Sequence, residues 1–143
     1  MTRAKNAGAC QSGYAMGLRS NTKADLLKAI TENWFWVLRD AKIIDAEYLE
    51  DNFTEEELSQ AGIYTKNTHE VRTSSFACGS ATVKACGSAT VKAYGSATVK
   101  ACGNSYVEDC TGNIRPESDY AIVKDYYNHK IYIKKGEFEI IEV

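Results

Sequence analysis

The sequence has little of what several protein classes require. It contains one proline and two histidines among 143 residues, and a single proline excludes a proline-rich linker protein. No stretch approaches 18 uninterrupted apolar residues, so no transmembrane helix is expected. Residues 1–20 lack the apolar core of a signal peptide. We therefore expect a cytoplasmic protein with no membrane partner.

Composition and charge indicate one soluble globular domain. Hydrophobic residues make up 44% of the chain, charged residues 25%, and the formal net charge is −2. This slight negative charge argues against a protein that coats nucleic acid. The five cysteines are an odd number, so in a reducing compartment we expect free thiols rather than a disulfide framework.

The strongest pattern is a repeat of eight residues. The unit CGSATVKA occupies residues 78–85 and 86–93, and residues 94–101 repeat it with tyrosine in the first place. A fourth unit that keeps only part of the pattern begins at Cys102, and after an irregular unit the register returns at Ala121. Identity this close at a fixed period is the signature of a repeat architecture.

Each unit offers a six-residue strand bounded by Gly-Ser, and such strands can be stacked in two ways. In an antiparallel meander with two-residue turns, Lys84 and Val91 would share a face, and no apolar face would remain to bury. In a solenoid every coil repeats the one before it, so every valine points inward and every lysine outward. We therefore predict a solenoid with Ala81, Val83, Ala85 and their equivalents inside, because the opposite parity would bury a column of lysines. The inward valines are then Val83, Val91, Val99, Val107 and Val123.

The small inward residues decide the width of a coil. Alanine and valine fill the space between two closely facing sheets, but not the wide triangle that three sides would enclose. We therefore favour two units per coil, about 16 residues, over three units, and expect about four coils. The alternation of β-branched valine and threonine favours strands over a disordered low-complexity tract.

Upstream of the repeat the apolar period changes from 2 to 3.6. The apolar positions of residues 23–40 lie along one helical face, which predicts a single helix. Shorter helices are expected over residues 46–52 and 55–61, the second with Thr54 and Glu57 as a capping box. Because a solenoid exposes strand edges at its ends, we expect these helices to cap its N-terminal end.

The fold class that follows is α+β, an N-terminal helical cap followed by a two-sided β-solenoid of about 16 residues per coil. Residues 130–134 and 138–143 carry larger apolar side chains and predict two strands that close the other end. The expected domains are an irregular arm over residues 1–20, a helical cap over residues 21–72, and the solenoid with its capping strands over residues 73–143.

The inventory of catalytic residues is thin. His69 and His129 lie in polar, loop-like contexts, which are typical of surface histidines. The sequence also has no nucleophile elbow, zinc-protease, phosphate-loop or dinucleotide-binding motif. We therefore expect no enzyme, no cofactor and no metal.

Four cysteines share one position of the repeat. At 16 residues per coil, Cys86 and Cys102 stack at one corner, and the opposite column consists of Cys78, Tyr94, Cys110 and Tyr126. A zinc ion needs four converging ligands, whereas stacked strands spread them about 4.8 Å apart along a line. We instead name Cys86 and Cys102, together with Tyr94 of the opposite column, as a candidate dimer contact of a homo-oligomer.

The lysines of the repeat form columns of their own. Lys84 and Lys100 stack one coil apart, whereas Lys92, Glu108 and Lys124 alternate in sign along the other sheet. We expect a solvated face rather than a phosphate-binding stripe, because few aromatic residues lie between the lysines. Nucleic acid is therefore not an expected partner.

Charge is uneven upstream, where residues 45–57 contain seven acids and no base. Such a run usually forms the wet face of helices, and the alternative is a surface that docks on a basic protein. The candidate protein-binding residues are Asp45, Glu47, Glu50, Asp51, Glu55, Glu56 and Glu57. Trp34, Phe35 and Trp36 lie within one helical turn and cannot all face inward, so at least one should pack on the solenoid or on another chain.

The run CGSATVKACGSATVKAYGSATVKAC resembles octad-repeat segments, with units such as YGSATVKA, in small proteins of gut bacteria and their phages. Here cysteine replaces the commoner tyrosine. The resemblance implies a phage or mobile-element accessory protein, and some such proteins inhibit host defence enzymes, CRISPR nucleases among them. The expected function is therefore a non-catalytic protein-binding module, an inhibitor of a host nucleic-acid enzyme. The alternative is a self-assembling structural β-solenoid.

Overall fold

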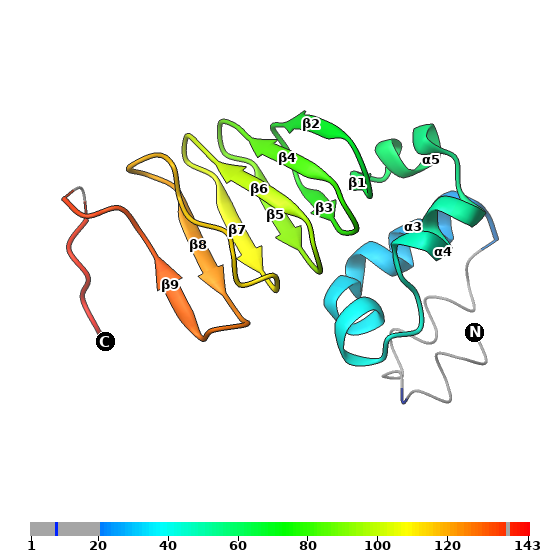
Figure 1. The fold of residues 1–143 in the computed structure, drawn as a ribbon, viewed down its shortest axis with the longest axis horizontal. Helices are drawn as coiled ribbons and strands as arrows, with labels where there is room; N and C mark the ends of the chain where they lie inside the picture. Colours follow the sequence, from blue (N-terminus) through cyan, green and yellow to red (C-terminus); the bar gives the residue numbers. More distant parts are fainter. Residues whose placement is uncertain (1–7, 9–20, 137) are drawn as a thin grey trace.

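The computed structural model describes residue 8, residues 21–136 and residues 138–143 (Figure 1). The arm expected over residues 1–20 lies, Gly8 apart, outside them. Within the described part, helical segments come first: α3 (Lys23–Glu32), the π-helix η1 (Trp36–Asp40), α4 (Ala46–Asn52) and α5 (Glu55–Gln60). The strands follow: β1 (Ile63–Tyr64), β2 (Thr68–Val71), β3 (Ser75–Ala77), β4 (Thr82–Ala85), β5 (Thr90–Ala93), β6 (Thr98–Ala101), β7 (Tyr106–Asp109), β8 (Ile122–Asp125) and β9 (Lys130–Tyr132).

The strands wind into a flat, two-sided β-solenoid, which confirms the predicted fold class. One sheet has the order β1-β3-β5-β7-β8-β9 and the other β2-β4-β6, and all pairs are parallel except β8 with β9. Thr82 pairs with Thr98, and Tyr106 pairs with Ile122. One coil therefore contains 16 residues and two repeat units, as predicted.

The interior of the coils consists of the predicted small side chains. Val83, Val91, Val107 and Val123 are fully buried, and so are the alanines on either side of Val83 and Val91. The strands of the repeat, β4 to β8, have four residues rather than the predicted six, because each corner is a turn. In one such corner the Ala89 N–H donates to the Cys86 carbonyl at 3.2 Å, which leaves only Thr-Val-Lys-Ala for the strand.

The single helix expected over residues 23–40 is wrong. Helix α3 ends at Glu32, where the Asn33 side-chain amide donates to the Ala29 carbonyl at 2.8 Å. The chain then widens into η1, in which the Ala41 N–H donates five residues back to the Trp36 carbonyl at 2.8 Å. The sequence period cannot show this change of helical pitch.

Both short helices have side-chain caps, and the capping box predicted for the second is confirmed. Helix α4 begins at Asp45, whose carboxylate accepts the Tyr48 N–H at 2.8 Å. Helix α5 begins with the expected capping box: the Glu57 N–H donates to Thr54 Oγ1, and the Thr54 N–H donates to Glu57 Oε1. Each cap satisfies backbone groups that a helix start leaves open.

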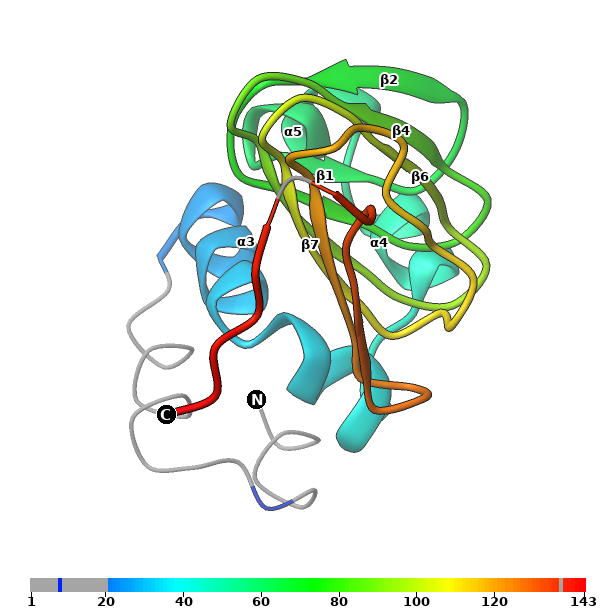
Figure 2. The same cartoon turned by 90° about the vertical axis from the view of Figure 1, so that its left-hand side faces the viewer.

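The helices lie beside the stack of coils as well as at its end. Figure 2 looks along the stack and shows α3 beside the strands, with α4 and α5 behind them. At the N-terminal end α5 contacts β1. Farther along, the rings of Phe35 and Tyr126 lie 6.3 Å apart, and Arg39 Nη1 donates to Cys110 Sγ at 3.2 Å. The helical segment thus follows the corner column from Cys78 to Tyr126.

Both ends of the solenoid differ from the expected boundaries. Strands β1 and β2 already belong to the two sheets, so parallel pairing begins at Ile63, inside the segment expected to be the cap. At the other end β9 pairs with β8, but residues 138–143 form no strand, and that prediction is wrong. No described helix is both long enough and apolar enough to span a bilayer.

Candidate functional site

The seven acids of residues 45–57 lie on α4, on α5 and at the N-cap of α4, and all but Glu57 are exposed. Two of these acids cap the starts of the helices. Asp45 caps α4, and Glu57 closes the capping box of α5 and lies 3.5 Å from Lys23 Nζ. The pKa of Glu57 is lowered, chiefly because the Thr54 N–H donates to its carboxylate. Both side chains therefore stabilise helix starts. The sequence predicts this role for Glu57 but not for Asp45.

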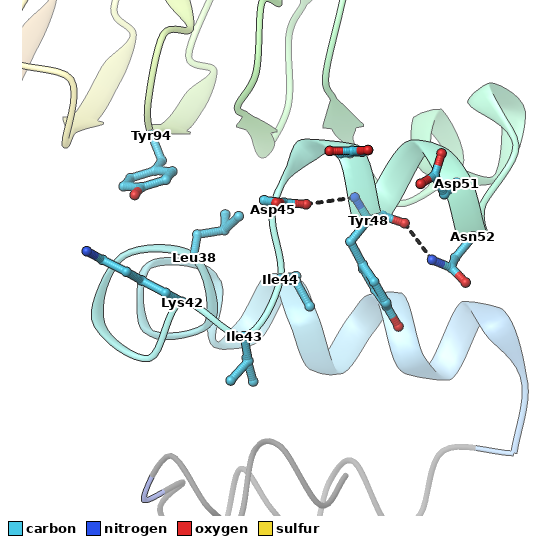
Figure 3. A pocket seen from close by; sticks show the side chains of 10 residues that line it. Leu38, Lys42, Ile43, Ile44, Asp45, Tyr48, Asp51, Asn52 and Tyr94 are labelled. Carbon is cyan, nitrogen blue, oxygen red and sulfur yellow. Dashed lines mark hydrogen bonds between the residues drawn. The ribbon is translucent and has the colours of Figure 1, made fainter.

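A groove of about 480 Å³ opens beside α4 (Figure 3). It brings together three of the seven acids, Asp45, Glu47 and Asp51, while Glu50 and the acids of α5 do not line it. The other lining residues are Leu38, Lys42, Ile43, Ile44, Tyr48, Asn52 and Tyr94. The groove therefore combines a cluster of carboxylates and one lysine with aliphatic and aromatic walls. We call it the acidic groove.

Tyr94 lies apart from the two cysteines with which it was predicted to form a dimer contact. It belongs to the corner column that faces the helices, packs against their core and lines the acidic groove. Cys86 and Cys102 stack at the opposite corner, where the Cys102 N–H donates to the Ala85 carbonyl at 3.0 Å. The prediction that all three residues form one contact patch is therefore wrong, because Tyr94 lies at one corner of the coil and the two cysteines lie at the opposite corner.

The buried thiols are held in the protonated form. Burial raises the pKa of Cys78 to about 12, and the nearby charges of Glu50 and Asp45 add to the effect. Burial also raises the pKa of Cys110, although Arg39 acts in the opposite direction. Because the thiolate is the nucleophile and the metal ligand, a raised pKa disfavours the reactive form of both side chains. Within the described residues no group of three or more His, Cys, Asp or Glu side chains could hold a metal ion.

The lysines stack as predicted, and each column also contains an acid. Glu70, Lys84 and Lys100 are in register on one sheet. On the other sheet Glu108 pairs with both Lys92 and Lys124. Neither column is a continuous basic stripe.

The histidines have local roles in the structure. His69 stacks near Tyr64, with 4.4 Å between the ring centroids, and its Nε2 lies 2.8 Å from the Lys66 carbonyl oxygen. His129 occupies a turn position with a positive φ of 57°. Neither ring lies beside the acidic groove.

The C-terminal end of the solenoid is a second surface of interest, and the sequence analysis missed it. The large apolar side chains that the structure shows as exposed all lie within residues 120–143: Tyr120, Ile122, Tyr127, Ile131, Phe138, Ile140, Ile141 and Val143. Five of them lie in the two segments that the sequence predicts to be closing strands: Ile131, Phe138, Ile140, Ile141 and Val143. We call this set the apolar end.

No protein-family model, curated protein or solved structure matches the chain.

Proposed function

We propose that this chain is a non-catalytic protein-binding module that docks on a basic surface of its partner through the acidic groove. The observation that carries the proposal is the groove itself, which joins three carboxylates to apolar walls. An arginine or lysine of the partner fits such a site, because its aliphatic stem packs on apolar walls such as Leu38 and Ile44 while its charged end meets Glu47 and Asp51.

The partner class that we propose is a host nucleic-acid enzyme such as a CRISPR nuclease. Two considerations support it. The repeat resembles segments found in phage and gut-bacterial proteins, and the density of acids on α4 and α5 offers a basic nucleic-acid channel a charge pattern similar to that of phosphates. Such complementarity raises the association rate and the specificity of docking.

The test is the double reversal Glu47→Lys with Asp51→Lys, which leaves the helix caps Asp45 and Glu57 intact. Binding to an immobilised CRISPR nuclease would be followed by surface plasmon resonance at several salt concentrations. We expect the association rate to fall at least about tenfold at low salt, with a smaller change in dissociation. The remaining association should depend less on salt.

The matched control is Glu117→Lys with Asp119→Lys, which changes the net charge equally at exposed positions far along the chain. It should bind like the wild type. Equal losses in both double variants would mean that net charge, not the groove, drives association. An unchanged rate in the groove variant would move the search to the sheet face around Thr82 and Lys84.

A second candidate function is a self-assembling structural β-solenoid. The observation that favours it is the apolar end, since large exposed apolar patches mark contact sites in soluble proteins. Light scattering coupled to size-exclusion chromatography separates the candidates. A series of oligomers that grows with concentration would support assembly, and a single species would exclude an open polymer.

A further inference from the structure

The last six residues of the chain have the composition of a strand but pair with no strand in the described part of the chain. Residues 138–143 read FEIIEV and have no strand assignment. Phe138, Ile140 and Ile141 are 50%, 75% and 72% exposed. The Phe138 ring meets the Tyr120 ring edge-on at 5.8 Å. This segment, which we call the tail, leaves most of its apolar surface in water.

Strand β9 has a free edge next to the tail. It pairs with β8 on one side, and no described strand pairs with its other side. Ile131 in its centre is 65% exposed, and the exposed Lys130 and Lys134 flank the apolar Ile-Tyr-Ile segment. An unpaired edge of this kind is a template for another strand. The two lysines disfavour pairing of β9 with a second β9, because like charges would lie opposite each other.

The tail complements this edge in charge and in apolar pattern. In an antiparallel register that places Glu139 opposite Lys134, Ile140 falls opposite Ile133 and Ile141 falls opposite Tyr132. The cross-strand pairs are then one ion pair and two apolar pairs, each of which stabilises a sheet. Glu142, the second acid of the tail, falls opposite Ile131 in the same register.

We propose that two copies of the chain exchange their tails, so that the tail of each copy adds a strand to the β9 edge of the other. The contact is the same in both directions, which gives a closed, two-fold symmetric dimer. It covers both free edges and most of both apolar ends. This inference rests on the second candidate function, self-association, and gives it a closed form. It does not involve the acidic groove.

Two charge-reversed variants test the exchange. The edge variant carries Lys130→Glu and Lys134→Glu, and the tail variant carries Glu139→Lys and Glu142→Lys. Mass would be measured by light scattering on size-exclusion chromatography over a wide range of concentration. We expect the wild type to be a dimer and each variant alone to be a monomer. Because each variant's tail then complements the other variant's edge, an equimolar mixture should form a heterodimer.

The matched control is the chain with all four changes, in which edge and tail are complementary again, and it should dimerise. Circular dichroism checks that every variant keeps the wild-type spectrum. A wild type that stays monomeric, variants that remain dimers alone, or a mixture that stays monomeric would each overturn the exchange. An open series of oligomers would overturn it while supporting structural assembly. Nuclease binding by the two variants reports on the acidic groove independently.

Discussion

Val91 is part of the apolar interior of the solenoid, at a position that does not tolerate a polar side chain. It lies fully buried between Ser75 and Val107 in the register of its sheet. Val91→Asp would place a carboxylate among apolar side chains with no partner, at a cost of several kcal/mol. We expect the variant to lose its cooperative thermal transition in circular dichroism. Lys100→Asp, on an exposed position of the repeat, is the control and should melt near the wild type; an unchanged melting temperature in Val91→Asp would refute the inward assignment.

Asp109 and Asp125 stand where the earlier repeats have alanine, and both are fully buried. Asp125 accepts hydrogen bonds from the N–H groups of Tyr127 and Asn128, at 2.8 and 2.9 Å, and from the Asn128 side chain at 2.8 Å. Asp109 accepts the N–H of Ile114 in the same manner. The carboxylates therefore shape the irregular corners after β7 and β8.

Asp125 should make stability depend on acid pH. Burial acts to raise its pKa, but the hydrogen bonds from Asn128 and Tyr127 outweigh burial, and the pKa is lowered. The stabilisation is thus present above the unfolded pKa of about 3.9 and is lost as pH falls through the folded value. Urea unfolding at a series of pH values should show this loss, and Asp125→Asn should reduce the slope below about pH 4. Equal slopes in both proteins would rule out Asp125 as the titrating group.

At the scale of elements, two corner glycines allow the cost of backbone strain to be measured apart from the cost of steric crowding when glycine is replaced by alanine. Gly79 and Gly95 share a repeat position and have positive φ values of 60° and 74°. A Cβ on Gly79 would lie 2.5 Å from the Thr65 carbonyl oxygen and 2.9 Å from Ala46 Cβ, whereas a Cβ on Gly95 meets nothing within 4 Å. The crowding at Gly79 lies where the first coils meet α4.

Gly95→Ala should therefore cost only the left-handed backbone strain, about 1–2 kcal/mol. Gly79→Ala should cost clearly more, because Thr65 and Ala46 must also move. The free energy of unfolding from chemical denaturation measures both. Similar losses of unfolding free energy in the two variants would mean that Thr65 and Ala46 move away from the new methyl group at no measurable cost.

Periodicity predicted the elements whose cause is local to the repeat. The alternation of Val and Lys was sufficient to assign the inward face, because parity is fixed along every strand. The small size of the inward residues was sufficient to assign the 16-residue coil. It failed for residues 23–40, since the apolar period does not show the end of α3 at Glu32 or the five-residue hydrogen bond of η1. It also failed for residues 138–143, because a strand needs a neighbouring edge as well as a suitable pattern.

At the scale of the whole molecule, the acidic groove could be predicted only in part. The run of acids on α4 and α5 is visible in the sequence, and so is the column that contains Tyr94. Which corner of the coil the helices follow is decided by tertiary contacts, such as the 5.4 Å ring contact between Trp34 and Phe76. Because the sequence does not show which corner the helices follow, it cannot assign Tyr94 to the acidic groove.

The contact between Phe35 and Tyr126 joins the helices to the far end of the stack. Phe35→Ala should lower the free energy of unfolding by about 1–2 kcal/mol, because a half-buried ring and one aromatic pair are lost. Hydrogen exchange measured by mass spectrometry should show faster exchange in β8. Tyr127→Ala, an exposed ring in the same turn, is the control, and equal protection of β8 in both variants would contradict the coupling.

These contacts between the helices and the far end of the stack restrict the number of coils that the solenoid can have. A simple solenoid can gain or lose a coil without penalty, because each coil touches only its neighbours, and identical adjacent units invite such changes. Here an added coil would displace Cys110 and Tyr126 by about one strand spacing, 4.8 Å, from the fixed positions of Arg39 and Phe35. The number of coils is therefore set by a segment that precedes the first of them.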